Sequence, residues 1–411
     1  MSKNYNYFHL KGRIFLNEIC KGLLFLFLTS LFFSCGSIRT AIILSKTSVI
    51  NLPKKKSLMK FDNSFSLVIL KVTIKGKSYR FVYDTGAGIT LVSKDAAKAI
   101  GLKKVTDVTV ADSQKSSQKL SVVVIDSMYV GNMCYTKVGA VVNDFSKIPQ
   151  LSCLNIDGIL GINVIKLSNW KINYDSTTVD VSDINNSLTE PNSFKSVSFN
   201  PNKQKMPCID FSVQNMKETF LIDMGDNGES VALPSKVNLD KKAVDIMVGY
   251  SASGLYGSKM DTTEYYRTDL TNPEISMSDV SISQPNNSKF LIGTGFLEKR
   301  FSCVVFDFKT NQLFVEDKAQ KDKQILSYGF SPQLVGNKII VGAKFLDFSA
   351  DINKLSVGDT IVGINNVIYN GNNSCQLLNE MLQSKYKKAL ITLSISKNNR
   401  TTNFTLTPKL L

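Results

Sequence analysis

The chain has 411 residues, 43% hydrophobic and 20% charged, which is typical of a globular protein with room for two or three domains. Its single histidine, His9, precedes the first apolar stretch, and this excludes histidine-based triads and metal sites from the folded domains. The net charge of +15 comes from scattered lysines with one compact cluster at 54–56, so we expect a solvated basic surface and no nucleic-acid partner.

Residues 1–35 have the pattern of a secretory signal, because basic residues precede an apolar run at 23–33 that is too short to span a membrane. Cys35 at its end resembles the lipidated cysteine of bacterial lipoproteins, although Phe32 stands where these usually have leucine. The resemblance implies an exported, periplasmic or cell-envelope protein with a lipid anchor in the membrane and a tether at 36–61. A plain cleaved signal and an uncleaved anchor are the alternatives.

Cysteine spacing does not define a disulfide framework. An odd number remains after the leader, at irregular intervals, so the sequence allows one or two bridges without specifying a pair. No CxxC motif occurs, and we expect no metal site. The remaining cysteines are Cys134, Cys153, Cys208, Cys303 and Cys375.

The chain contains an internal repeat. Segments 74–84 and 213–223 each run from a β-branched residue through a polar turn into an apolar strand that ends on an aspartate, which indicates a β-hairpin in each. Further on, 159–165 and 291–297 align without a gap, each with a glycine at its third position. These matches predict two copies of one β-rich unit, at 62–185 and 196–318.

The first copy resembles the retropepsin and pepsin-like aspartic peptidases. The family's marks here are Phe81-Val82-Tyr83-Asp84-Thr85-Gly86-Ala87 and Ile159-Leu160-Gly161. The resemblance implies a mainly β fold, with two tandem retropepsin-like β-barrel lobes forming a pepsin-like bilobal unit. It also implies an aspartic endopeptidase that acts on peptides or proteins without a cofactor. Because one chain supplies both lobes, we expect a monomeric peptidase unit.

Asp84 and Asp223 are the catalytic residues that this resemblance implies. Two adjacent carboxylates cannot both ionise readily, so the pair holds one proton and can act as base and acid in turn. The Thr85 hydroxyl would tie the two loops together, and glycine permits the close approach of the backbones. The remaining supporting residues implied for the active loops are Gly86, Ala87, Gly225, Gly161 and Gly293.

The second copy departs from the family pattern at Met224 and Asp226. Met224 has no hydroxyl, so half of the tie between the loops is expected to be missing. Asp226 adds a carboxylate near the pair, although we expect it and Glu229 to be solvated loop charges. Two hypotheses remain: a working but asymmetric pair, or a decayed second lobe that binds peptide without cutting it.

Other carboxylates have simpler interpretations. Asp84 could instead cap a helix at 96–100, and Asp175 and Asp307 stand at matched positions that favour turns. The resemblance also implies a hairpin flap over substrate in each lobe, at 108–124 and 247–259. Tyr256 lies at the expected tip of the second flap, either at a substrate subsite or as an ordinary edge aromatic.

Residues 325–408 resemble a PDZ domain, on the pattern Leu-x-x-Gly-Asp-x-Ile-x-x-Ile-Asn that begins at Leu355. A helix at 375–384 and a last strand at 390–396 are expected. The resemblance implies that Tyr328, Gly329 and Phe330 form a loop that holds the carboxylate of a peptide added as a strand. A domain that merely braces the two lobes is the alternative.

Overall fold

The computed structural model describes residues 43, 46–51, 58–111, 117–184, 188, 194–240, 242–254, 257–286, 288–318, 326–369, 373–382, 390–397 and 400–410. The expected signal, Cys35, the lysine cluster and most of the tether lie outside these ranges, and so do Tyr256 and the tip of the first flap. None of the helices within the described ranges is long and apolar enough to cross a bilayer.

The first half of the structure is a closed barrel of strands β3 to β9, called the first barrel. Strand β4 pairs in parallel with β9 and β5 with β8, while β7 pairs with both β3 and β8 and closes the ring. The strands are β1 (Ser48–Asn51), β3 (Ile69–Ile74), β4 (Lys77–Tyr83), β5 (Thr90–Ser93), β6 (Lys104–Ala111), β7 (Ser117–Val130), β8 (Met133–Asn143) and β9 (Gly158–Leu160). The helices are η1 (Ser64–Ser66), α2 (Lys94–Ile100), η2 (Phe145–Lys147), α3 (Pro149–Cys153) and α4 (Ile162–Ile165).

The second barrel, strands β13 to β19, repeats this connectivity. Strand β14 pairs in parallel with β19 and β15 with β18, and β17 pairs with both β13 and β18. The strands are β13 (Cys208–Val213), β14 (Met216–Asp223), β15 (Val231–Ala232), β16 (Asp245–Gly254), β17 (Gly257–Thr271), β18 (Ser276–Gln284) and β19 (Leu291–Gly293), followed by α5 (Thr294–Arg300). The repeated sequence thus folds into repeated pairing.

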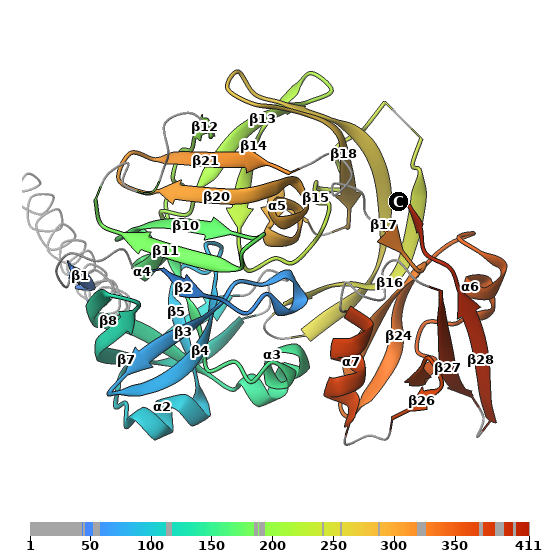
Figure 1. Ribbon diagram of the computed structural model, residues 1–411, viewed down its shortest axis with the longest axis horizontal. Coiled ribbons are helices and arrows are strands. Elements are labelled where there is room, and N and C mark those ends of the chain that lie inside the picture. Colours follow the sequence, from blue (N-terminus) through green and yellow to red (C-terminus); the bar gives the residue numbers. More distant parts are fainter. Residues whose placement is uncertain are drawn as a thin grey trace, which may run out of the picture.

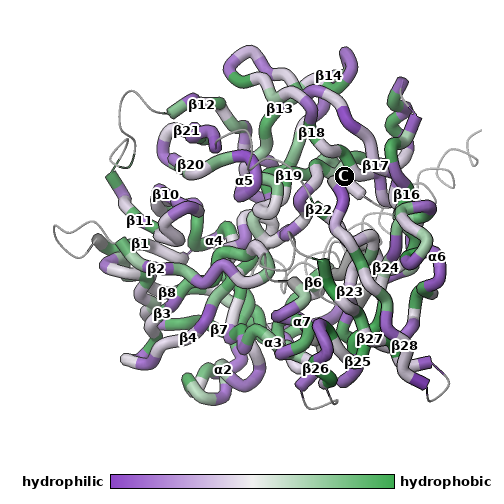
Figure 2. The backbone as a smooth tube through the Cα atoms, turned by 45° about the vertical axis from the view of Figure 1, so that its right-hand side comes forward, coloured by the Kyte–Doolittle hydropathy of each residue, from purple (hydrophilic) through white to green (hydrophobic). Residues whose placement is uncertain are grey.

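Both expected hairpins are confirmed. Ile74 pairs with Lys77, and Val213 pairs with Met216 across a two-residue turn. Both central residues of each turn have positive φ, which the mirror-image turns of tight hairpins require. Figure 2 shows the turn between β13 and β14 as hydrophilic. Gly76 and Asn215 are the residue types that accept this geometry most readily.

A six-stranded sheet joins the two barrels (Figure 1). In it β10 from the first half pairs with β20 from the second, so that Trp170 lies opposite Phe306. Both rings are fully buried, and the Tyr83 ring lies 5.0 Å from that of Trp170 between centroids. One hydrophobic core therefore runs through both barrels. The strands are β2 (Met59–Lys60), β10 (Asn169–Asn173), β11 (Thr178–Ser182), β12 (Lys195–Ser198), β20 (Phe301–Asp307) and β21 (Gln312–Asp317).

The C-terminal domain, residues 326–410, has its own core, and its strand β24 continues the sheet of the second barrel by pairing with β16 (Figure 1). The expected helix is present as α7, but the strand expected to be last, now β27, is followed by β28 and β29, so that expectation is wrong. The elements are β22 (Leu326–Ser327), β23 (Phe330–Val335), β24 (Lys338–Phe345), α6 (Ala350–Lys354), β25 (Thr360–Ile364), β26 (Val367–Ile368), α7 (Ser374–Leu382), β27 (Ile391–Lys397), β28 (Arg400–Leu406) and β29 (Lys409–Leu410).

Candidate active site

Asp84 and Asp223 lie at equivalent points of the two barrels. Asp84 directly follows β4, and its backbone N–H donates to the Leu160 carbonyl on β9 at 3.1 Å. Asp223 is the last residue of β14, where it pairs with Gly293 of β19. Parallel pairing thus places a downstream glycine beside each aspartate, although 70 or more residues separate them in sequence.

Each aspartate is held by the backbone of its own loop. Asp84 Oδ1 accepts hydrogen bonds from the N–H groups of Gly86 at 2.8 Å and Ala87 at 2.9 Å. Asp223 Oδ1 accepts one from Gly225 at 2.9 Å, whereas the N–H of Asp226 donates to the Asp223 carbonyl at 3.2 Å. The loops are therefore similar but unequal.

The two loops face each other across the junction between the barrels. A Cβ added to Gly86 would lie 2.3 Å from the Asp223 carboxyl, and one added to Gly225 would lie 2.4 Å from the Asp84 carboxyl. Each carboxyl group therefore lies against the glycine of the opposite loop, and the two groups interact strongly with each other. Only glycine leaves room for this arrangement, because no other residue lacks a Cβ.

Thr85 ties the two loops together in the manner expected. Its buried hydroxyl donates to the Ile222 carbonyl at 2.6 Å and accepts from the Met224 N–H at 3.0 Å. The Met224 side chain is fully buried in the core shared by the barrels and offers no hydroxyl in return. The sequence departure at this position is therefore filled by apolar packing.

The carboxyl pair has raised pKa values. Burial, followed by the neighbouring Asp223 carboxylate, raises the pKa of Asp84 well above its usual value, and burial likewise raises the pKa of Asp223. Because the two groups interact strongly, their protons belong to the pair rather than to either residue. Such a pair retains one proton at a pH where isolated aspartates are fully ionised.

Asp226 is not the solvated loop charge that the sequence predicted. Burial, with a further contribution from the Asp223 carboxylate, raises the pKa of Asp226 to about 7. Its carboxyl packs against Gly293, where an added Cβ would lie 2.6 Å from Oδ2, and Oδ1 accepts from the Gly228 N–H at 3.3 Å. The prediction failed because only the folded loop shows that this side chain turns inward. Glu229 is also partly buried.

The downstream glycines support the loops in matching ways. The N–H of Ile162 donates to the Ala87 carbonyl at 2.8 Å, and that of Thr294 donates to the Asp226 carbonyl at 2.7 Å. A Cβ at Gly161 would lie 2.5 Å from the Ile89 backbone. Because Gly161 and Gly293 have no Cβ, each active loop can pack closely against the strand beneath it.

Asn163 is a supporting residue that sequence reasoning missed. Its buried amide accepts from the N–H and hydroxyl of Thr90, at 2.8 and 2.9 Å, and donates to the Gly139 carbonyl at 2.9 Å. The only signal was one asparagine within an apolar run. Gly295 takes the aligned position in the second barrel, so the second loop lacks this amide.

The alternative interpretations of the aspartates are also settled by these contacts. Helix α2 is capped by Ser93, whose hydroxyl accepts from the Ala96 N–H at 3.1 Å, so Asp84 is not its cap. Asp307 Oδ1 accepts from the N–H groups of Lys309 and Thr310, each at 2.9 Å, as a turn residue does. Asp175 is exposed and lies 3.4 Å from the Lys318 ammonium.

The expected flap segments fall on hairpins of the barrels, β6–β7 and β16–β17, both longer than anticipated. In the C-terminal domain, Tyr328 is buried and Gly329 has a φ of 86° beneath the Phe348 ring. The Gly329 N–H donates to the Ser327 hydroxyl at 3.0 Å, so this N–H already has a partner. Phe330 begins β23 and is partly buried.

No group of three histidine, cysteine, aspartate or glutamate side chains in the described part of the chain could hold a metal ion. The chemistry that the site offers is that of two interacting carboxyl groups that share one proton. Such a pair can deprotonate a water molecule and protonate a leaving group.

Comparison with known families agrees with this geometry. Residues 70–164 match the aspartyl protease family, and the match includes Asp84, its loop and Gly161. This supports an aspartyl protease domain in the first barrel. None of the curated proteins matches the chain.

Proposed function

We propose that the chain is an exported aspartic endopeptidase in which Asp84 and Asp223 activate a water molecule. The observation that carries the proposal is the mutual insertion of the two loops, in which each glycine lies against the other loop's carboxyl. Placing two carboxylates so close costs folding free energy unless they share a proton. A pair with raised pKa values is common where that proton is used in catalysis.

The proposed reaction needs only this pair, water and an extended peptide. The ionised carboxyl takes a proton from water while the water oxygen attacks the peptide carbonyl carbon. The protonated carboxyl donates a hydrogen bond to the carbonyl oxygen. The leaving nitrogen is then protonated, and the C–N bond breaks, which returns the pair to its singly protonated state. The backbone N–H groups of Gly86, Ala87 and Gly225 donate to the two carboxyls and hold both in place.

The test is cleavage of a mixed peptide substrate between pH 4 and pH 8. We expect Asp84→Asn and Asp223→Asn each to reduce kcat at least ~1,000-fold, since removal of an essential catalytic group has effects of this order. Asp175→Asn is the matched control, because Asp175 is an exposed residue in the turn between β10 and β11. Equal activity in the Asp84 variant and the wild type would contradict the proposal.

A second candidate function is peptide binding without cleavage, and it is favoured by Met224 and Asp226. A third carboxyl beside the pair opposes its ionisation. The hydroxyl tie between the loops comes from Thr85, and Met224 supplies no matching hydroxyl. If the wild-type protein binds an extended peptide but cuts none across the pH range, this candidate replaces the first.

The remaining parts of the proposal concern location and partners. We propose a PDZ-type C-terminal domain that assists recognition of peptide substrates, and a lipid anchor at Cys35 that holds the protein at the cell envelope. The disulfide between Cys153 and Cys375 supports export, because such bonds persist in oxidising compartments. Since one chain supplies both aspartates, a monomer suffices for activity, and light scattering of the purified protein tests this.

A further inference from the structure

The C-terminal domain is attached to the second barrel by strand pairing. Strand β16 pairs antiparallel with β24, so that Met247 lies opposite Phe345, and the Leu346 N–H donates to the Ile246 carbonyl at 2.8 Å. The Tyr265 ring packs edge-on against Phe345, with centroids 5.2 Å apart. This attachment is non-covalent and extends the sheet of the second barrel.

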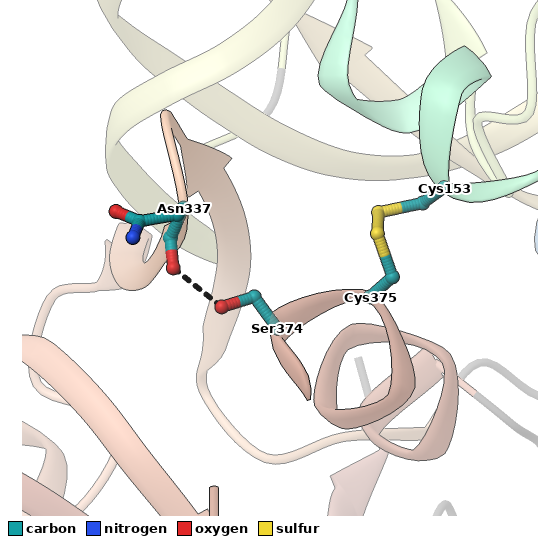
Figure 3. The surroundings of a disulfide bond; sticks show 4 residues. All are labelled: Cys153, Asn337, Ser374 and Cys375. Atoms are coloured by element: carbon teal, nitrogen blue, oxygen red, sulfur yellow. Dashed lines mark hydrogen bonds between the residues drawn. A yellow bond between two sulfur atoms is a disulfide. The ribbon is translucent and has the colours of Figure 1, made fainter. Parts of the chain in front are cut away.

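The attachment to the first barrel is different, because it includes a covalent bond. Cys153 at the end of α3 is bonded to Cys375 in the first turn of α7, with Cα atoms 5.1 Å apart (Figure 3). Helix α3 also packs beside β23, and Phe65 of η1 packs against the core of the C-terminal domain. The two cysteines are 222 positions apart in the sequence, and the whole second barrel lies between them.

The position of this bond favours its reduction in the folded protein. The bond lies where the first barrel meets the C-terminal domain. Cys153 is buried there, with 8% of its surface exposed, whereas Cys375 is only partly buried. Cys375 is the second residue of α7, and free N–H groups at the start of a helix stabilise a thiolate. A stabilised thiolate favours the reduced state and makes a disulfide easier to open.

Reduction would leave α7 in place within its own domain. The Ser374 hydroxyl, next to Cys375, donates to the Asn337 carbonyl in the turn between β23 and β24 (Figure 3). Leu377 and Leu378 are buried in the core of that domain. The bond therefore fixes one folded unit to another and is not required to hold α7 on its sheet.

We propose that Cys153–Cys375 is a reducible latch that holds the C-terminal domain on the first barrel. A dithiol reductant supplies two electrons and two protons, which yields thiols at Cys153 and Cys375 and converts the dithiol into its own disulfide. The domain then loosens from α3 but stays on the second barrel through β16 and β24. This uncovers the side of β23 and α7 that faces α3, where a PDZ-type domain would add a peptide strand.

The test uses the full chain, oxidised or treated with dithiothreitol under native conditions, followed by thiol alkylation and hydrogen–deuterium exchange. We expect Cys153 and Cys375 to gain alkyl groups without global unfolding. Amide exchange in α3, α7 and β23 should become ~10-fold faster, whereas exchange in β10 and β20 should not change. A bond that resists dithiothreitol until the protein unfolds, or reduction without faster exchange at α3 and α7, would overturn the proposal.

Variants provide an independent comparison. The double variant Cys153→Ser with Cys375→Ser should show the exchange pattern of the reduced wild type without any reductant. The control Cys134→Ala alters a buried free cysteine on β8 and should keep the oxidised pattern. If the double variant does not fold, reduction of the wild type still decides the matter. None of these measurements depends on peptidase activity, so the proposed function can fail separately.

Discussion

Among the described side chains, the Thr85 hydroxyl both donates a hydrogen bond to the opposite active loop and accepts one from it. Because it is buried and satisfies the Ile222 carbonyl and the Met224 N–H, its loss leaves two backbone groups without partners. We predict that Thr85→Val lowers the free energy of unfolding by about 2–5 kcal/mol. Denaturant titration measures this, and Thr85→Ser, which keeps the hydroxyl, should lose much less. A loss in Thr85→Val no larger than that in Thr85→Ser would contradict a stabilising role for the hydroxyl.

Asp226 makes the stability of the fold depend on pH. Its pKa is raised to about 7 in the folded protein, so between about pH 4 and 7 the folded state holds a proton that the unfolded state has released. Stability therefore falls as pH rises through this window, by about 4 kcal/mol at most. We predict that Asp226→Asn is more stable than the wild type at pH 8 and that the difference disappears near pH 4. Parallel stability curves for the two proteins would contradict this.

At the scale of elements, the parallel pairs β4–β9 and β14–β19 place the two loops, and glycine lets them meet. We predict that Gly86→Ala separates the carboxyls, because its Cβ would lie 2.3 Å from the Asp223 carboxyl. Gly88→Ala is the matched control on the same loop, since the nearest atom to its Cβ, on Met206, is 3.6 Å away. The rate of peptide cleavage and the midpoint temperature of thermal unfolding should both be lower in the Gly86 variant. Both should be nearly unchanged in the Gly88 variant.

At the scale of the whole molecule, Gly249 decides whether the C-terminal domain can pair with the second barrel. Its φ is 133°, and an added Cβ would lie 2.3 Å from the Gly342 carbonyl oxygen on β24. We predict that Gly249→Ala breaks the pairing of β16 with β24 and makes the protein more sensitive to limited proteolysis. Gly336→Ala, also at positive φ but with no atom within 4 Å, controls for backbone strain alone. Equal protease sensitivity in the two variants would contradict this assignment.

Much of this organisation was already present in the local sequence. The residue types of strands and turns predicted the two hairpins, because alternating apolar residues and positive-φ turns act over a few residues. The repeat placed Asp84 and Asp223 at matched strand ends, and the structure brings these two carboxyls into contact. The sequence by itself therefore determined that the fold is mainly β, and it determined which residues end the strands.

Only the tertiary structure decided what surrounds those residues. The inward turn of Asp226, the amide of Asn163 beneath the first loop, and the bond between Cys153 and Cys375 join segments far apart in the chain. The pairing of β16 with β24, which couples the C-terminal domain to the second barrel, is equally non-local. Burial and pKa depend on which distant groups fold against a residue, and a local pattern of residue types carries no record of them.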